Sequence, residues 1–287
     1  MAAPRYSRPV AVRLGVFVVP DAEDSGLTLA QIDAADELGL DVVGVQDHPY
    51  QRRFLDTWTL LPYAAARTRR VVLVPDVANL PLRNPAVLAK AAASLDVLSG
   101  GRVELGLGAG AFWHAIAAMG GPRRDGPTSV DALEEAITVI RAMWSGDRDL
   151  RVAGRHYALD GVNSGPRPPH PIGIWLGAYG PRMMRVIGRL ADGWLPSVPR
   201  LPPAEVAARR AAIDEAARAA GRDPAGIVRA VNLSLEGAPG TWAEQALRAH
   251  RELGFDVLIL SAVDGGHPLD VVTRIAEDVA PAVRAAV

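Results

Sequence analysis

The sequence contains no cysteine, which excludes disulfide bonds, thiolate metal sites, cysteine-held iron–sulfur clusters and a cysteine nucleophile. Lysine is nearly absent too, since Lys90 is the single lysine among 31 basic residues. These are balanced by 32 acidic residues, so we expect neither nucleic acid nor an anionic membrane surface as a partner. No apolar run approaches the roughly 18 residues that a membrane-spanning helix needs.

Two further absences concern targeting and metals. Arg13 interrupts the early apolar stretch before it reaches the length of a signal-peptide core, so we expect a soluble, cytoplasmic protein. The histidines lie far apart and show no paired ligand spacing, so no metal site is expected. They are His48, His114, His156, His170, His250 and His267.

What is present is a regular alternation of short apolar runs with alanine-rich amphipathic stretches. Val12–Val19 and Asp41–Gln46 are typical of strands, and Leu29–Leu38 between them is typical of a helix. Val257–Ser261 is apolar without alternation, as in a sheet covered on both faces. Eight such units along 287 residues predict an α/β fold, a (β/α)8 TIM barrel of parallel strands.

No linker divides the chain, so a single barrel domain is expected over residues 1–287. The loosest stretch, Gly146–Pro171, is rich in glycine and proline and is expected to be an insertion before the fifth strand. Thr128, with Asp131 three residues later, predicts a capping box that opens a helix ending near Trp144.

Active sites of such barrels lie at the carboxyl ends of the strands. The second predicted strand is followed by Gln46–Tyr50, which contains an Asp-His pair, and the third by Pro75–Pro85. The fourth and fifth are followed by Gly106–His114 and Gly177–Arg182. These four segments are therefore expected to meet at one end of the barrel.

Four motifs in the chain resemble those of the bacterial luciferase-like monooxygenase superfamily, whose barrels use flavin or deazaflavin cofactors. They are L-P-L-R-N-P-A-V-L-A-K (Leu80–Lys90), L-D-V-L-S-G-G-R-V-E-L-G-L-G-A-G (Leu95–Gly110), G-A-Y-G-P-R (Gly177–Arg182) and L-A-D-G-W (Leu190–Trp194). In this order and spacing they extend the resemblance over nearly the whole chain. It implies a luciferase-like barrel with near-minimal insertions, an oxidoreductase activity and a homodimer.

The glycine-rich segment Gly106–Gly110 is not expected to be a dinucleotide-binding fingerprint. That motif opens the first strand–helix turn of a doubly wound domain, whereas three strands precede it here and no acid-tipped strand follows at about 20 residues. A tight turn is the alternative interpretation. The resemblance implies instead that Gly108, Ala109 and Gly110 clear space for the planar cofactor ring.

The segment Gly177–Gly180 precedes a helix that begins at Pro181, where backbone N–H groups and the helix dipole can bind an anion. Arg182 in the first turn opposes the dipole unless it has an anionic partner. A plain turn is the alternative. The resemblance implies that the cofactor phosphate is bound here, by Gly177, Ala178, Tyr179, Gly180 and Arg182.

The Asp47-His48 pair resembles the deazaflavin branch of the superfamily, in which the histidine acts near the reactive ring carbon. A structural histidine is the alternative. Flavin-using relatives more often carry Glu-His-His at this point, so coenzyme F420 is favoured over FMN. Asp76 and Val77 align with a family β-bulge that supports the ring and contains a non-prolyl cis peptide, expected here between Pro75 and Asp76.

One departure bears on the substrate. Deazaflavin-dependent glucose-6-phosphate dehydrogenases carry a catalytic Glu after the glycine-rich strand, where this chain has Ala111. Their phosphate-binding lysines have no counterpart, because Lys90 falls in a predicted helix. We therefore expect a small apolar or aromatic organic substrate rather than a sugar phosphate. The candidate substrate-binding residues are Tyr50, Phe112, Trp113, His114 and Trp194.

Together these features predict F420-dependent hydride transfer to or from such a substrate, with His48 and Asp47 in the catalytic site. The first alternative is an FMN-dependent monooxygenase supplied with reduced flavin by a separate flavin reductase. The second is a non-catalytic cofactor-binding protein of the same fold, since a fold does not determine a function.

Overall fold

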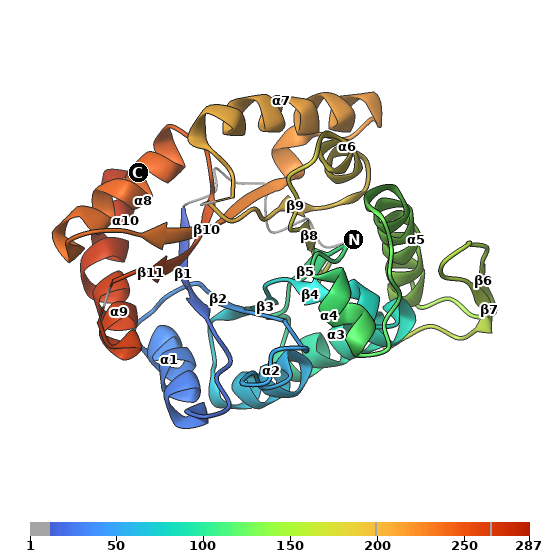
Figure 1. Ribbon diagram of the computed structural model, residues 1–287, viewed down its shortest axis with the longest axis horizontal. Coiled ribbons are helices and arrows are strands. Elements are labelled where there is room, and N and C mark those ends of the chain that lie inside the picture. The colour runs from blue at the N-terminus through green and yellow to red at the C-terminus, as the bar shows by residue number, and fades with distance from the viewer. Residues whose placement is uncertain (1–11, 199, 265) are drawn as a thin grey trace.

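The computed structural model describes residues 12–198, 200–264 and 266–287, and it confirms the predicted barrel. A ring of parallel strands forms the centre and helices surround it (Figure 1). The strands of the ring are β1 (Arg13–Val18), β2 (Val42–Val45), β3 (Val72–Pro75), β4 (Ala78–Asn79), β5 (Leu105–Gly108), β8 (Ile174–Leu176), β9 (Gly193–Trp194), β10 (Val228–Leu235) and β11 (Val257–Ala262).

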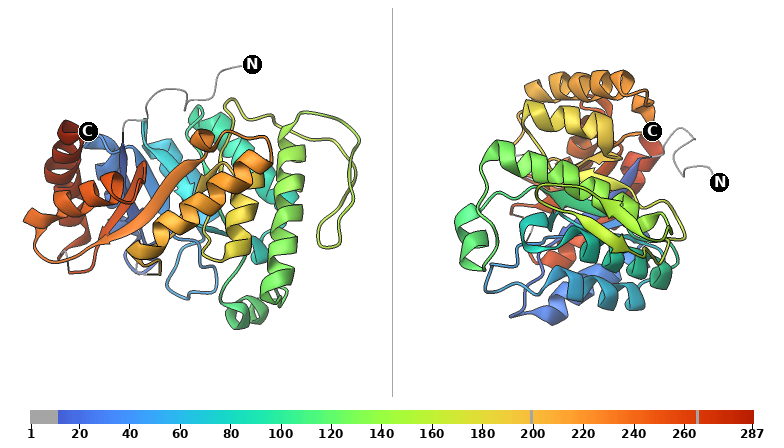
Figure 2. Two further views of the ribbon diagram at one scale, coloured as in Figure 1. Left: turned by 90° about the horizontal axis from the view of Figure 1, so that it is seen from above. Right: turned by 90° about the vertical axis from the view of Figure 1, so that its right-hand side faces the viewer.

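The helices alternate with these strands and pack on the outside of the ring (Figures 1 and 2). They are α1 (Ser25–Glu37), α2 (Thr57–Arg67), α3 (Pro85–Ser99), α4 (Trp113–Ala118), α5 (Gly126–Trp144), α6 (Pro181–Leu190), α7 (Pro203–Ala219), α8 (Trp242–Arg251), α9 (Pro268–Arg274) and α10 (Ala280–Ala286). A π-helical turn over Ile275–Val279 joins α9 to α10.

Hydrogen-bonded neighbours follow the order β3-β2-β1-β11-β10-β9-β8-β5-β4, and every pairing in this sheet is parallel. β3 and β4 occupy one position in the ring, separated by a bulge at Asp76 and Val77. A parallel bridge between Leu73 and Val103 joins β3 to the chain just before β5 and closes the ring. The described strands thus fill eight positions, as the eight predicted units require.

The insertion expected over Gly146–Pro171 contains an antiparallel hairpin, β6 (Leu150–Val152) and β7 (Leu159–Val162). It projects beside α5, away from the ring (Figures 1 and 2). It therefore adds nothing to the barrel's carboxyl-end mouth.

Side chains alternate between two apolar layers. Inside the ring, Val42, Val74, Trp175 and Ile259 are fully buried against one another. Outward-facing residues such as Leu14 pack beneath the helices in a second, larger cluster. A sheet covered on both faces accounts for the unbroken apolar strands in the sequence.

Helix starts are set by side-chain caps. Asp24, Asp56 and Asn84 accept backbone N–H groups at the first turns of α1, α2 and α3. The capping box predicted at Thr128 is wrong: α5 begins two residues earlier, at Gly126, and Asp125 is its cap, accepting from the Thr128 N–H at 2.8 Å. The Asp125 carboxylate at the cap position and Pro127 in the first turn fix that earlier start.

In the part of the chain that the structure describes, no helix has the length and apolar character needed to cross a membrane. Most of the segment behind the expectation of no signal peptide, residues 1–11, lies outside the described residues.

Candidate active site

A cavity of about 480 Å³ lies at the carboxyl ends of the strands, inside the mouth of the ring. It is bounded by the segments that follow β2, β3, β5, β8 and β9, by Phe17 of β1 and Asn232 of β10, and by the start of α5. The rule for barrels of this type locates function at this end.

Asp47 follows β2 and is buried, and both of its carboxylate oxygens have partners. Oδ1 accepts from Arg83 at 2.8 Å, while Oδ2 accepts from Arg83 Nε at 3.0 Å and from the backbone N–H of Asn79 at 2.9 Å. Arg83 also donates to Asp56, the cap of α2. Asp47 thus holds the loop after β4 against the end of β2, and its geometry is that of a positioning residue.

His48 lies beside Asp47 in a group of aromatic rings. Its Nδ1 is 3.3 Å from the Tyr50 hydroxyl, and its ring centre is 5.4 Å from Tyr50 and 5.5 Å from Phe112. The guanidinium of Arg200 lies 6.0 Å from the Phe112 ring centre. These rings form an apolar side of the cavity with one imidazole in it.

The charge state of His48 follows from this setting. Burial lowers its pKa, the Asp47 charge raises it and Arg200 lowers it, with a net shift below the ordinary value. Burial raises the pKa of Tyr50 to about 12. At neutral pH the imidazole is therefore neutral and the phenol protonated. The phenol can donate to Nδ1 when the ring proton is on Nε2, or accept from Nδ1–H, which leaves Nε2 free to take a proton.

The bulge between β3 and β4 contains a cis peptide bond between Asp76 and Val77. The sequence prediction placed it one bond earlier, after Pro75. The Asp76 N–H still donates to Val45 O at 2.7 Å, so pairing with β2 continues through Asp76 and breaks only after it. Val77 is thereby turned toward the cavity that it lines.

The Asp76 carboxyl is buried beneath the cavity, where a Cβ on Gly44 would lie 2.7 Å from its Oδ2. Its Oδ1 accepts from Asn232 Nδ2 at 2.8 Å, whereas Oδ2 has no hydrogen-bond partner. Burial raises the pKa of Asp76 to about 7, despite the Asn232 bond that lowers it. Burial therefore favours the protonated form of the Asp76 carboxyl.

Hydrogen bonds link the far side of the mouth to this carboxyl. Asn232 Nδ2 also lies 3.3 Å from Ser197 Oγ, and the Ser197 N–H donates to the Tyr179 hydroxyl at 3.0 Å. The Oδ1 atoms of Asn232 and Asn79, like Asp76 Oδ2, are buried without a partner. Buried polar groups are rarely left unpaired, so this cluster is suited to a ligand with polar ring edges.

Glycines leave room on either side of Val77. A Cβ on Gly108 would lie 2.8 Å from Val77 Cγ2, and one on Gly177 would lie 3.1 Å from the same atom. Any side chain at Gly108 would displace Val77 and at Gly177 would press on it. The result is a smooth face suited to a flat ring.

Thirteen of the seventeen residues singled out from the sequence line this one cavity. They are Asp47, His48, Tyr50, Asp76, Val77, Gly108, Ala109, Gly110, Phe112, Gly177, Ala178, Tyr179 and Gly180. The remaining four, Arg182, Trp113, His114 and Trp194, do not line it.

The placement of those four corrects the expectation. Arg182 pairs with Asp131 and donates to Pro127 O at 3.1 Å. Its anionic partner is therefore Asp131 of α5 and not a phosphate. Trp194 is fully buried in the outer layer and donates to Ala178 O at 3.0 Å. Trp113 packs behind Gly110, and His114 is exposed on α4.

Sequence reasoning missed Ser197, Arg200 and Asn232, which follow β9 or lie in β10. A signal was present for Asn232: in β10 the residues Val228 and Ala230 face the ring interior, and the alternation continues to Asn232. A polar residue at an inward position of an apolar strand marks the mouth. Among the described residues, no group of three or more His, Cys, Asp or Glu is arranged to hold a metal ion.

Comparison with known proteins gives a consistent result. The sequence model of the luciferase-like monooxygenase family matches residues 12–266. The chain is 35% identical over 167 residues to an F420-dependent glucose-6-phosphate dehydrogenase of Amycolatopsis mediterranei (strain U-32), covering 56% of this chain and 50% of that protein.

A second relative is the phthiodiolone/phenolphthiodiolone dimycocerosates ketoreductase of Mycobacterium sp. (strain JLS), 33% identical over 245 residues, with 79% of this chain and 61% of that protein covered. The chain spans about half to three fifths of these two relatives. A solved F420-dependent secondary alcohol dehydrogenase, in complex with an F420-acetone adduct, shares the fold with a TM-score of 0.82 and 20% identity. The superposition covers 95% of this chain and 99% of the alcohol dehydrogenase chain.

Proposed function

Because the chain belongs to the luciferase-like monooxygenase family, we propose that it is an F420-dependent oxidoreductase acting on the alcohol–carbonyl pair of a small apolar substrate. The observation that carries the proposal is the neutral His48, bonded to Tyr50, in the same cavity as the Asp76–Val77 bulge. The relatives named above supply the reaction class, since they comprise two dehydrogenases and a ketoreductase.

The cavity fits a deazaflavin ring on three counts. Its volume is within the roughly 300–1,000 Å³ of small-molecule sites. Gly108 and Gly177 leave a smooth face at Val77. The unpartnered oxygens of Asn79 and Asn232 offer acceptors for a polar ring edge, and Asp76 Oδ2 offers a donor when protonated and an acceptor when ionised. When bound, the deazaflavin would supply or accept the hydride.

The phosphate would bind at Gly177–Gly180, because this segment leads directly into α6, which begins at Pro181 and lacks a side-chain cap. Its first-turn N–H groups are therefore available to an anion. Arg200 lines the same cavity and adds positive charge on its aromatic side, beside Phe112.

The chain's own groups provide the proton chemistry. In alcohol oxidation the neutral imidazole, in the tautomer whose Nδ1–H donates to the Tyr50 oxygen, accepts the hydroxyl proton at Nε2 and becomes an imidazolium. In carbonyl reduction the imidazolium gives this proton to the carbonyl oxygen and returns to the neutral form. Tyr50 holds the tautomer through Nδ1, and Asp47 fixes the end of β2 on which His48 stands. Phe112 and the aromatic group around it exclude water from the reacting carbon.

The substrate is proposed to differ from glucose 6-phosphate. Ala111 lines the cavity where a carboxylate would stand in those dehydrogenases, and Lys90 is exposed on α3, away from the mouth. The cavity's aromatic side favours an apolar group beside the reacting carbon.

The test is a titration of the apoprotein with F420 and with FMN, followed by fluorescence quenching. We expect micromolar or tighter binding of F420 and weaker binding of FMN. The reverse preference would replace the proposal with an FMN-dependent monooxygenase served by a flavin reductase. Tight F420 binding without turnover on any alcohol or carbonyl compound would leave a cofactor-binding protein, and no binding of either would reject the phosphate site.

A homodimer and a cytoplasmic location belong to the same proposal, and the family resemblance supports the homodimer. Sedimentation velocity at micromolar concentration tests the first, since a mass of twice 30.3 kDa is expected.

A further inference from the structure

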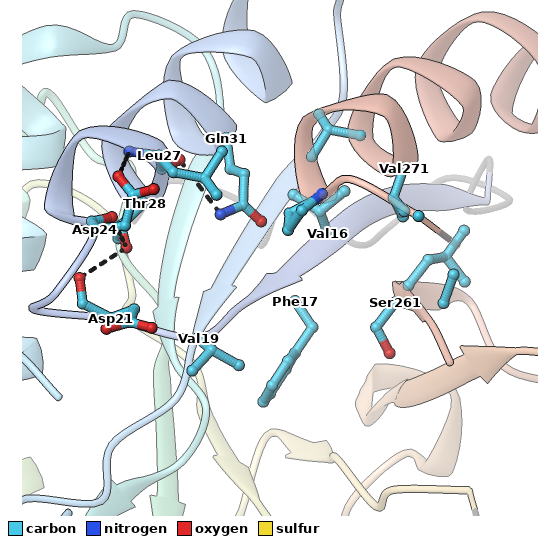
Figure 3. A pocket seen from close by; sticks show the side chains of 15 residues that line it. Val16, Phe17, Val19, Asp21, Asp24, Leu27, Thr28, Gln31, Ser261 and Val271 are labelled. Carbon is cyan, nitrogen blue, oxygen red and sulfur yellow. Dashed lines mark hydrogen bonds between the residues drawn. The ribbon is translucent and has the colours of Figure 1, made fainter. Parts of the chain in front are cut away.

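A second cavity of about 270 Å³ lies next to the active-site cavity, between α1 and α9 at the carboxyl ends of β1 and β11. Figure 3 shows Leu27 on α1 and Val271 on α9 on opposite sides of it, with Val16 on β1 between them. We call it the side cavity. Phe17 lines both this cavity and the active-site cavity, so the two adjoin at the edge of β1.

The polar side chains around the side cavity are engaged with the protein itself. Asp24 accepts from the Leu27 N–H at 2.9 Å, and Thr28 donates to the backbone oxygens of Asp21 and Asp24. The carboxylate of Asp21 pairs with Arg53 at 2.8 Å. A ligand with its own polar groups would therefore gain few hydrogen bonds here.

The other polar side chains of the side cavity are also engaged with the protein itself. Gln31 donates through Nε2 to Leu27 O at 3.3 Å, and the hydroxyls of Ser261 and Ser234 lie 3.3 Å apart. What remains for contact is aliphatic surface from Val16, Leu27 and Val271. An apolar ligand gains from burial against such surface without leaving polar groups unpaired.

We propose that the side cavity binds an alkyl chain of the substrate, whose alcohol or carbonyl carbon lies at His48. The inference rests on the proposed function and specifies its substrate as a molecule with an aliphatic chain of several carbons. The adjacency of the two cavities supports one occupant for both, because both have Phe17 in their lining and both lie at the carboxyl end of the barrel. The alkyl chain would cross the carboxyl ends of β1 and β11, where Phe17 and Ser261 lie (Figure 3).

The experiment measures kcat/KM of the F420-loaded enzyme for 2-alkanones from propanone to 2-decanone, with reduced F420. In the unaltered protein kcat/KM rises about two- to fourfold per added methylene until the side cavity is full, then levels off. Val271→Trp fills the cavity from α9 and removes this rise while propanone turnover changes less than twofold. Val87→Trp on α3, where Val87 is 67% exposed, is the matched control and keeps the full rise.

Leu27→Phe, from the opposite side, repeats the test if Val271→Trp does not fold. A flat chain-length series in the unaltered protein, or a rise that survives both substitutions, overturns the inference. Octane provides a second readout: it competes with 2-decanone but not with propanone, and competition with both or with neither also overturns it.

Failure of the proposed function is recognised separately. If F420 does not bind or no alkanone turns over, calorimetry of 2-decanone with unaltered and Val271→Trp protein still tests the cavity. A dissociation constant at least tenfold weaker in the variant supports an alkyl site, and equal constants reject it.

Discussion

Burial and the Arg200 charge lower the pKa of His48, and the Asp47 charge raises it. The net pKa lies below the ordinary value, so the imidazole is neutral at neutral pH. We expect His48→Ala to lower kcat by about 10²–10⁴-fold, the usual contribution of a positioned proton donor or acceptor. The dissociation constant for F420 should change less than threefold. Stopped-flow turnover and fluorescence titration measure the two quantities.

Tyr50→Phe is the matched control, because it keeps the ring contacts with His48 and Phe112 and removes only the hydroxyl at Nδ1. Its loss of kcat should be smaller than that of His48→Ala. If His48→Ala weakened F420 binding as much as turnover, the histidine would be a binding residue and not a proton carrier.

The buried Asp76 carboxyl should make the free energy of unfolding depend on pH. Its pKa is about 7 in the folded protein against an ordinary 3.8, so between these values the folded state binds more protons than the unfolded chain. The free energy of unfolding therefore falls as pH rises from about 4 to 7, and the penalty persists above 7. Asp76→Asn should raise stability more at pH 8 than at pH 5, measured by urea denaturation. Asp147→Asn, at an exposed site, should show no such difference between the two pH values.

Among the elements, the ends of β2, β4 and α2 depend on a single guanidinium. Arg83 pairs with buried Asp47 and with the cap residue Asp56. Arg83→Met leaves the Asp47 charge buried without its cation, and we expect a loss of about 3–5 kcal/mol in the free energy of unfolding. Arg67→Met removes a surface pair with Asp33 and should leave the unfolding midpoint nearly unchanged. Equal effects of the two would show that the Asp47 carboxylate is hydrated when Arg83 is lost.

Element positions were predictable where the apolar pattern was long. The strand expected over Val12–Val19 is found at Arg13–Val18, and the strand over Asp41–Gln46 at Val42–Val45. The start of α1 was placed four residues late, at Leu29, because its first turn is polar and Asp24 caps it. Local propensity alone does not reveal such a cap-driven start.

Side-chain direction was the less predictable property. Gly193–Trp194 is too short a strand to show an alternation, so Trp194 was assigned to the mouth when it faces the helices. Arg182 was assigned to phosphate because its partner Asp131 is 51 residues away and no local pattern joins them. The first error concerns the facing of a very short strand and the second a long-range ion pair, and the local sequence encodes neither.

For the whole molecule, the two ends of the barrel differ in what their buried charges do. At the carboxyl end buried Asp47 is paired with Arg83, but Asp76 Oδ2 lacks a partner. At the amino end the carboxyls are paired: His170 Nδ1 lies 2.8 Å from the Asp96 carboxylate and Nε2 lies 3.9 Å from Glu104. Glu104 also accepts from the Gly173 N–H at 2.5 Å, so this cluster joins the starts of β5 and β8 to α3. In such barrels the amino end is associated with stability and the carboxyl end with function.

The amino-end cluster should therefore make stability depend on pH. Burial lowers the pKa of His170, but the hydrogen bonds and charges of Asp96 and Glu104 outweigh it and raise the pKa to about 9. A raised histidine pKa stabilises the folded state fully below about 6.5, and that stabilisation is lost as pH rises through 9. This rise in the pKa of His170, from 6.5 to about 9, corresponds to at most about 3 kcal/mol in the free energy of unfolding. His170→Gln should remove this slope, so that urea denaturation at pH 6 and pH 9 shows a much larger deficit at pH 6. His267→Gln, at an exposed histidine, should leave the slope intact, and a His170→Gln deficit independent of pH would mean that packing, not charge, accounts for the residue's contribution.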